Sequence, residues 1–227
     1  MPTPPIKLSP SDLTFLWDEC PRCFYLKYLH GISRPAAPFP SIFGAIDRLM
    51  KAQFAGRPAS ELDPSLPPGF VSVSEQWIES VPISLPGHAL SCFLRGKIDA
   101  MIGFDDGSYA VVDFKTSEPK PAQIPFYCRQ LHAYAYALEH PAPNRLNCSP
   151  ISRLGLYVET PHATLAATTS EISFHFRSTW LEIPFHESGF LGFLDKVLAL
   201  LELPKPPPAG EDCTYCHYRQ HAREHGM

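Results

Sequence analysis

Two stretches, Gly96-Lys97-Ile98-Asp99 and Val111-Val112-Asp113-Phe114-Lys115-Thr116, decide the fold of this chain. Each belongs to a segment that predicts a β-strand, about 90–104 for the first and about 108–116 for the second. The turn between them, Asp105-Asp106-Gly107-Ser108, contains the Asp-Gly dipeptide that hairpins favour. The sequence therefore predicts an antiparallel hairpin in the middle of the chain.

Charged side chains lie together at the open end of this hairpin, the end away from its turn. Pairing of the strands brings Asp99 next to Asp113, and Lys115 points to the same face as Asp113 because the two are two residues apart. Neighbouring carboxylates repel each other unless a cation lies between them. The pattern predicts a site for a hard divalent cation such as Mg²⁺. The alternative is a pair of solvated strand-end acids with a lysine beside them.

Such a site can activate water. A divalent cation lowers the pKa of a bound water and stabilises negative charge on a phosphoryl oxygen. Lys115 is placed to orient that water or to offset the developing charge. Asp99, Asp113 and Lys115 are therefore the candidate catalytic residues, and both carboxylates are candidate metal ligands.

A helix predicted over about 124–140 follows a proline-rich connection and ends before Pro141. Gln130 and Tyr134 are four residues apart and share one face of it. A Gln-x-x-x-Tyr helix directly after an Asp-x-Lys strand resembles the fourth motif of the RecB-type exonuclease branch of the PD-(D/E)XK nuclease superfamily. The resemblance implies that Gln130 and Tyr134 flank the active site and contact metal-site groups or the nucleic-acid strand. The alternative is two polar residues on the exposed face of an amphipathic helix.

The resemblance covers most of the chain. Leu8-Ser9-Pro10-Ser11-Asp12 and the segment 20–28 are similar to the N-terminal helix of this branch, which includes the CRISPR-associated adaptation exonuclease and AddB-like repair nucleases. It implies an α/β fold with a restriction-endonuclease-like core, in which helices flank a mixed central β-sheet. It also implies that Asp99 and Asp113 bind Mg²⁺ or Mn²⁺ together with the backbone carbonyl of Phe114.

The branch usually carries a metal-binding histidine a few residues after a glycine on an early helix. We expect that helix over about 41–55, where Gly44 is followed by Asp47 in place of the histidine. Aspartate also binds Mg²⁺ or Mn²⁺, and an all-oxygen shell favours Mg²⁺. Asp47 is therefore a further candidate metal ligand, with an exposed helix residue as the alternative.

Two Cys-x-x-Cys pairs lie near opposite ends of the chain, Cys20 with Cys23 and Cys213 with Cys216. Each pair can place both sulfurs on one metal centre, so the two pairs supply four ligands. The centre would join the N-terminal and C-terminal segments of the chain. A disulfide pair or free thiols are the alternatives, although disulfides need an oxidising compartment.

RecB-type nucleases often bind a 4Fe–4S cluster through one N-terminal and three C-terminal cysteines, whereas this chain has two and two. By resemblance we expect a 4Fe–4S cluster on the four cysteines. Zn²⁺ is the alternative, since four thiolates suit both. Three histidines after the last cysteine are further candidate ligands: His217, His221 and His225.

The composition predicts one folded domain. The 227 residues, 44% of them hydrophobic, are enough to bury a core. We expect a single nuclease-like domain over 1–227, in which 204–227 is a proline-rich linker plus a Cys/His tail docked on the N-terminal helix. Further elements are expected as helices over about 10–30 (broken near Cys20-Pro21) and 189–201, and as strands over about 70–80, 151–160 and 171–184. We find no signal peptide or transmembrane stretch, so we expect a cytoplasmic location and no membrane partner.

The formal net charge of −4 is unusual for a protein that binds nucleic acid, since phosphate contacts favour a basic surface. Local clusters of basic residues offset it, and the candidate nucleic-acid contacts are Arg22, Lys27, Lys120 and Arg129. Aromatic residues are interleaved with them and can stack on single-stranded bases. The charge suggests a weak intrinsic affinity for DNA and a protein partner, in a repair or defence complex, that supplies the rest.

Two function classes follow. The first is a metal-dependent DNA exonuclease or endonuclease that hydrolyses phosphodiester bonds in single strands or at ends, in DNA repair, recombination or CRISPR-type defence. The second is a nuclease-fold DNA-binding or adaptor protein with a structural metal centre and weak or no catalysis. The retained Asp99, Asp113 and Lys115 favour the enzyme. The missing histidine and the acidic net charge favour the adaptor.

Overall fold

The computed structural model describes residues 4–36, 40–73, 75–168 and 170–226. Its strands are β1 (Ile6–Leu8), β2 (Gly69–Val73), β3 (Trp77–Glu79), β4 (Cys92–Lys97), β5 (Ala100–Phe104), β6 (Tyr109–Lys115), β7 (Ile151–Ala167) and β8 (Ile172–Ile183). Its α-helices are α1 (Phe15–Glu19), α2 (Pro21–His30), α3 (Ser41–Phe54), α4 (Ile124–Glu139), α5 (Glu187–Leu201) and α6 (Thr214–Glu224). Short 3-10 turns are η1 (Pro10–Leu13), η2 (Ala59–Glu61) and η3 (Pro121–Gln123).

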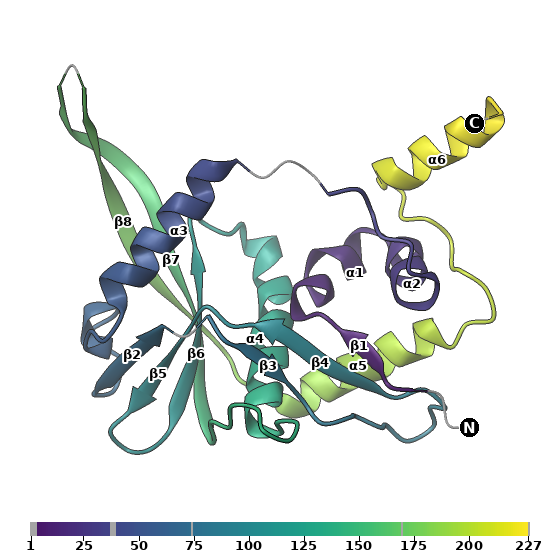
Figure 1. Cartoon of the computed structure of the whole chain (residues 1–227), viewed down its shortest axis with the longest axis horizontal. Coiled ribbons are helices and arrows are strands. Elements are labelled where there is room, and N and C mark those ends of the chain that lie inside the picture. Colours follow the sequence, from purple (N-terminus) through teal and green to yellow (C-terminus); the bar gives the residue numbers. More distant parts are fainter. Residues whose placement is uncertain (1–3, 37–39, 74, 169, 227) are drawn as a thin grey trace.

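The strands form two sheets, and Figure 1 shows them with the helices around them. The larger sheet has the order β2-β5-β6-β7-β8 and is mixed, because β6 and β7 run parallel whereas its other neighbours are antiparallel. Parallel neighbours need a crossover connection, and α4 supplies it between β6 and β7. The smaller sheet has the order β1-β4-β3. The expected α/β architecture with a mixed sheet between helices is confirmed.

The expected hairpin is formed by β5 and β6. Ala100 pairs with Val112, which continues the register toward Asp99 and Asp113. At the turn, the Phe104 amide donates to the Ser108 carbonyl at 2.9 Å, and Gly107 adopts φ 84°, a conformation that glycine permits without strain.

The larger sheet is covered on both faces, and β6 is buried along most of its length. Val112 and Phe114 pack with α3 residues such as Met50 in one core. Val111 packs in the other core, which is built from α4, α5, α2 and the smaller sheet. Because side chains alternate along β6, Asp113 lies on the α4 side of the sheet, next to a buried apolar layer.

The region before the hairpin differs from the expectation. The strand expected over 90–104 is interrupted at Ile98 and Asp99, so that β4 belongs to the smaller sheet and β5 to the larger one. The strand expected over 70–80 is likewise two strands, β2 and β3, in different sheets. An apolar pattern does not show whether a run of strand residues forms one long strand or two strands that pair in different sheets. Both predictions were wrong for this reason.

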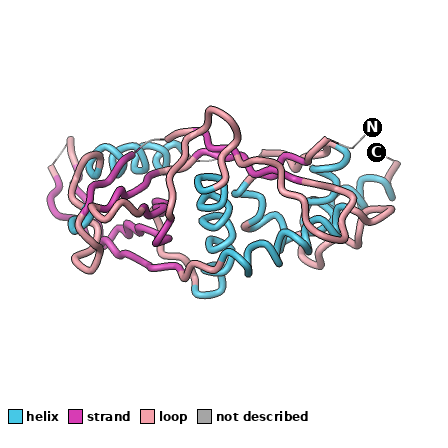
Figure 2. Tube along the Cα trace, turned by 90° about the horizontal axis from the view of Figure 1, so that it is seen from below, coloured by secondary structure: helices cyan, strands magenta, loops and turns pink. Residues whose placement is uncertain are grey.

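The ends of the chain also carry elements that the pattern did not reveal. β1 adds to β4 in parallel, with Ile6 opposite Cys92. The helix expected over 10–30 breaks at Cys20 as predicted, into α1 and α2, and its first turn is the separate 3-10 turn η1. β7 extends to Ala167 and pairs with β8 to its end, forming the long ribbon that projects from the sheet in Figure 1. The tail holds a regular helix, α6. Figure 2 shows the helices and strands from below, with both termini at the same end of the molecule.

Candidate active site and cysteine centre

The break between β4 and β5 places Asp99 at the junction of the two sheets. The side chain of a residue in an uninterrupted strand faces only one side of its sheet. Asp99, at the break, contacts groups on two different elements. Its Oδ2 accepts a hydrogen bond from the Phe114 amide at 3.3 Å, and its Oδ1 lies 2.9 Å from the Lys51 ammonium. Asp99 is thereby tied to β6 and to α3.

Asp113 stands on β6 with its side chain almost fully covered, at 5% exposure, and forms an ion pair with Lys115. Burial raises the pKa of the Asp113 carboxyl to about 6, and the nearby charge of Asp99 adds to this, while Lys115 opposes it. The pKa of Lys115 is also raised, because the ion pair with Asp113 outweighs the burial that disfavours its charge. The carboxylates of Asp99 and Asp113 therefore lie within electrostatic reach of each other, as expected for the hairpin end.

Two side chains of α4 complete this face. Gln130 Nε2 lies 3.4 Å from Asp113 Oδ1 and 3.0 Å from the Tyr134 hydroxyl, and donates to both. Tyr134 is 5% exposed, and burial raises its pKa. Lys115 also lies over the Tyr127 ring, with Nζ 4.6 Å from its centroid. The helix thus holds both the acid and the lysine of β6 from one side.

Two further charged residues belong to the site and were missed in the sequence. The Lys51 ammonium, on α3, contacts Asp47, Glu75 and Asp99, and Glu75 is also paired with Lys97 at 2.7 Å. The pKa of Lys51 is raised, since these carboxylates outweigh its burial, and the pKa of Glu75 falls to about 2 because of Lys97 and Lys51. The spacing of Asp47 and Lys51, four residues apart on a helix, was a signal for an ion pair but not for its proximity to Asp99.

The donor set suits a hard divalent cation. Asp113 Oδ2 is buried, and the Lys115 ammonium is its ion-pair partner in the described part of the chain. The carboxylates of Asp99 and Asp113 still repel each other, and a divalent cation between them would relieve this repulsion. Asp99 offers further oxygen atoms nearby, and oxygen ligands are those that Mg²⁺ and Mn²⁺ prefer. The backbone of Phe114 lies between Asp113 and Lys115 on the same strand.

The candidate nucleic-acid contacts are not gathered in one place. Lys27 is paired with Asp12 at 2.6 Å, and Arg129 is paired with Asp18. Lys120 is exposed before η3. Arg22, on the same helix as Lys27, lines a surface cavity between α2 and α6.

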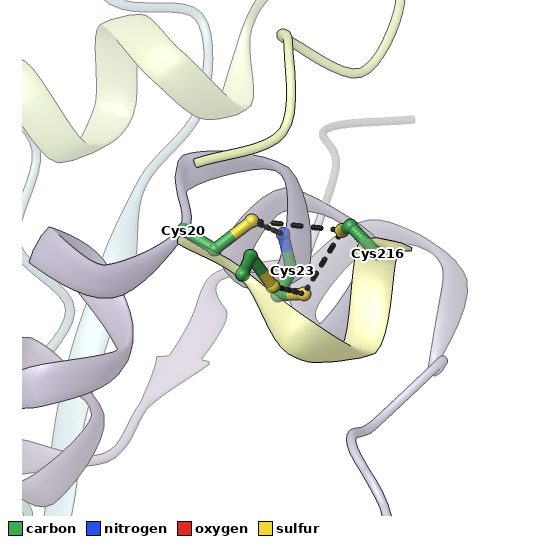
Figure 3. Close-up of side chains that lie close together, drawn as sticks. Cys20, Cys23 and Cys216 are labelled. Atoms are coloured by element: carbon green, nitrogen blue, oxygen red, sulfur yellow. Dashed lines mark hydrogen bonds between the residues drawn. The ribbon is translucent and has the colours of Figure 1, made fainter. Parts of the chain in front are cut away.

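The four cysteines form a compact cluster (Figure 3). Their sulfur atoms all lie within 4.8 Å of one another, with separations of 3.7 Å for Cys20–Cys216, 3.7 Å for Cys23–Cys213 and 3.6 Å for Cys23–Cys216. The predicted meeting of the two Cys-x-x-Cys pairs is confirmed. Among the described residues, none of the three tail histidines joins the cluster.

The cluster is built by the break between α1 and α2. Cys20 caps α2 in an extended conformation, and its Sγ accepts hydrogen bonds from the Cys23 amide at 3.4 Å and the Gly210 amide at 3.3 Å. Burial opposes ionisation of Cys20, but these amides outweigh it and lower the pKa to about 7. Arg34 Nη2 lies 3.5 Å from Cys213 Sγ. The backbone N–H groups therefore favour the thiolate of Cys20, the form that binds metal, whereas burial raises the pKa values of Cys23 and Cys216.

Within the described residues, no helix has the length and apolar character needed to cross a membrane.

Comparison with known proteins agrees with this geometry. No curated protein matches the chain. A solved structure titled "Crystal structure of SSO0001" is similar, with a TM-score of 0.53 and 17% identity over 96% of this chain and 86% of that chain, which shows a shared fold. The family model described as "PD-(D/E)XK nuclease superfamily" matches residues 65–221, a range that holds the hairpin, α4 and the second cysteine pair. The chain therefore belongs to the PD-(D/E)XK nuclease superfamily.

Proposed function

We propose that this protein is a divalent-metal-dependent DNA nuclease of the RecB-type branch, acting on single strands or ends. The observation that supports it most is the convergence of Asp99, Asp113 and Lys115 at one end of the hairpin, where the two carboxylates lie close together and Lys115 is paired with the buried Asp113. An ion pair between Asp113 and Lys115 that served only stability would need no second carboxylate beside it. Metal-dependent phosphodiester hydrolysis does, because the second carboxylate helps to hold the divalent ion. A role in repair, recombination or CRISPR-type defence, with a protein partner, is proposed from the order of the sequence motifs alone.

In this mechanism Asp99, Asp113 and the Phe114 carbonyl would hold the divalent ion. When bound, such an ion lowers the pKa of water and offsets charge on a phosphoryl oxygen. Lys115 orients the attacking water through its ammonium group. The water oxygen gives up a proton to solvent and forms a bond to phosphorus, the bond to the leaving oxygen breaks, and that oxygen takes up a proton from solvent. Gln130 fixes Asp113 while this occurs.

The test uses the purified chain with end-labelled single-stranded and double-stranded DNA and either Mg²⁺ or Mn²⁺. We expect cleavage by the wild type and at least about a hundredfold loss in Lys115→Met, since a group aimed at the reacting atoms contributes on this scale. Lys196→Met, at an exposed lysine of α5, is the control and should cleave normally. Equal background cleavage by wild type and Lys115→Met under every condition would instead support a binding or adaptor protein.

For the DNA contact we propose the cavity between α2 and α6, of about 580 Å³. Arg22, Arg219 and Arg223 line it, and none of them has an ion pair among the described residues. Glu224 is its one acidic residue in the described part of the chain, and that side chain is bound to Gln220 at 3.0 Å. Like charges placed together favour an anion between them, and the phosphates of a DNA strand provide it.

For the cysteine centre we propose Zn²⁺. A tetrahedral zinc ion with sulfur ligands at about 2.3 Å sets its sulfur atoms about 3.8 Å apart. Three of the six sulfur separations, at 3.6 and 3.7 Å, are close to this value, and all six lie within 4.8 Å. In a 4Fe–4S cluster each cysteine binds a different iron, so the four sulfur atoms must stand further apart than the ligands of a single ion. A colourless protein with one zinc per chain supports zinc, and a brown protein absorbing near 400 nm supports the cluster.

A further inference from the structure

The carboxylates near the active site surround a buried ammonium group. Lys51 Nζ lies 2.9 Å from Asp47 Oδ2, 3.0 Å from Glu75 Oε1 and 2.9 Å from Asp99 Oδ1. Only 9% of the Lys51 side chain is exposed. Removing an ammonium group from water is costly unless several partners compensate it. Three carboxylates around one buried lysine therefore form a built cation site whose cation belongs to the chain itself.

Lys51 and the proposed metal position lie next to different oxygen atoms of Asp99. The Oδ1 atom faces Lys51. The Oδ2 atom accepts from the Phe114 amide, beside Asp113. Asp99 therefore has a cation at one oxygen already and offers the other to the position that it shares with Asp113.

The charges of the whole group suit one divalent ion better than two. The four carboxylates are those of Asp47, Glu75, Asp99 and Asp113, and the three ammonium groups are those of Lys51, Lys97 and Lys115. One negative charge is left over. A single divalent ion reverses it to one positive charge, which a substrate phosphate balances, whereas two such ions would leave a strong excess of positive charge.

We propose that the Lys51 ammonium occupies the place that a second divalent ion takes in two-metal nuclease sites, so that this protein works with one metal ion. In two-metal sites the ions stand about 3.5–4 Å apart and clamp the attacking and leaving oxygens. Here Lys51 neutralises Asp99 at its Oδ1 atom. The inference rests on the proposed nuclease function, and it assigns Asp47 to hold the lysine rather than the metal.

The test counts Mn²⁺ ions without DNA and without cleavage. Mn²⁺ binding to the purified chain is measured by electron paramagnetic resonance and by calorimetry. We expect one ion per wild-type chain. In Lys51→Met the three carboxylates lose their common cation, and we expect a second ion to bind, so that the count rises from one to two. In Lys51→Arg a cation is kept, and the count should stay at one.

Lys97→Met is a matched control, because Lys97 also contacts Glu75 at 2.7 Å but no other carboxylate of the group. It should bind one ion, like the wild type. If Lys51→Met does not fold, the wild-type count alone still decides, since two ions on the wild type overturn the proposal. One ion on folded Lys51→Met also overturns it. Both results leave the nuclease function standing, whereas a wild type that binds no Mn²⁺ overturns the nuclease function and the Lys51 proposal together.

Discussion

Gln130, on α4, donates from Nε2 to the Oδ1 of Asp113 on β6, across a distance of 3.4 Å. The contact joins a helix side chain to the buried acid of the hairpin. Asp113 thus has the neutral amide of Gln130 at Oδ1 and the Lys115 ammonium at Oδ2. Gln130 therefore acts on the site through the orientation of Asp113.

The first prediction follows from this contact. Gln130→Leu should lower the cleavage rate by about 10- to 100-fold, as the loss of hydrogen bonds that orient metal ligands commonly does. It should also weaken Mn²⁺ binding measured by calorimetry, a readout that a purely structural role would not change. Tyr134→Phe is the control, because it removes a partner of Gln130 but leaves the contact with Asp113. Unchanged Mn²⁺ affinity in Gln130→Leu would contradict the positioning role.

The second prediction concerns the cysteine centre. Cys213→Ser should release the bound metal and lower the melting temperature by more than about 10 °C, since structural zinc contributes several kcal/mol to folding and each kcal/mol shifts a domain of this size by about 2–4 °C. Metal content and thermal unfolding are measured together. Cys148→Ser, at a buried cysteine outside the cluster, should keep the metal in full. A Cys213→Ser protein that keeps one metal ion per chain and the wild-type melting temperature would rule out a metal centre that joins the N-terminal and C-terminal segments through Cys213.

The sequence was most informative where neighbouring residues decide the outcome. The Asp-Gly turn, the shared face of Asp113 and Lys115, and the spacing of Gln130 and Tyr134 all depend on the geometry of one element or one hairpin, and the structure places them as expected. The proximity of the two cysteine pairs, although they lie near opposite ends of the chain, was predictable because two Cys-x-x-Cys pairs together supply the four ligands of one metal centre.

The rest depended on how distant elements pack. Lys51 reaches Asp99 only because α3 lies over the larger sheet, and Glu75 reaches Lys51 from the connection between β2 and β3. The break at Ile98–Asp99 arises because β4 and β5 pair with different partners, which no periodicity within the segment reveals. It is this break that allows Asp99 to contact both Lys51 and β6.

The third prediction tests the arginine cavity. Replacing Arg22, Arg219 and Arg223 together by alanine should weaken binding of single-stranded DNA, measured by fluorescence anisotropy in EDTA so that no cleavage occurs. The slope of log affinity against log salt should fall by about 0.7 for each phosphate that the variant no longer neutralises, or about 2 in all. Arg153→Ala, whose partner is Glu182 at 3.1 Å on the ribbon, should leave the slope unchanged. An unchanged slope in the triple variant would remove the cavity from the DNA path.

The fourth prediction is a pH dependence of stability at His88. Its ring lies between Asp195, in the middle of α5, and Glu202, at the end of that helix, with Nδ1 2.9 Å from Glu202 Oε2 and Nε2 2.9 Å from Asp195 Oδ1. Hydrogen bonds to Glu202 and Asp195 raise the pKa of His88 above its usual value of 6.5. A group whose pKa is higher in the folded than in the unfolded state contributes its full stabilisation at pH values below its unfolded pKa. This stabilisation is lost as the pH rises through the folded pKa. The contribution of His88 should therefore be largest near pH 6 and decline toward pH 9.

Urea unfolding of wild type and His88→Gln at pH 6, 7.5 and 9 measures this contribution as a difference in unfolding free energy. The difference should shrink as the pH rises, because the wild-type imidazolium loses its proton while glutamine has none to lose. In a Glu202→Gln background, which removes one of the two partner carboxylates, the His88 difference should depend less on pH. A His88 difference that stays constant from pH 6 to pH 9 would mean that the ring is held by neutral hydrogen bonds, and that the two carboxylates do not stabilise its charged form.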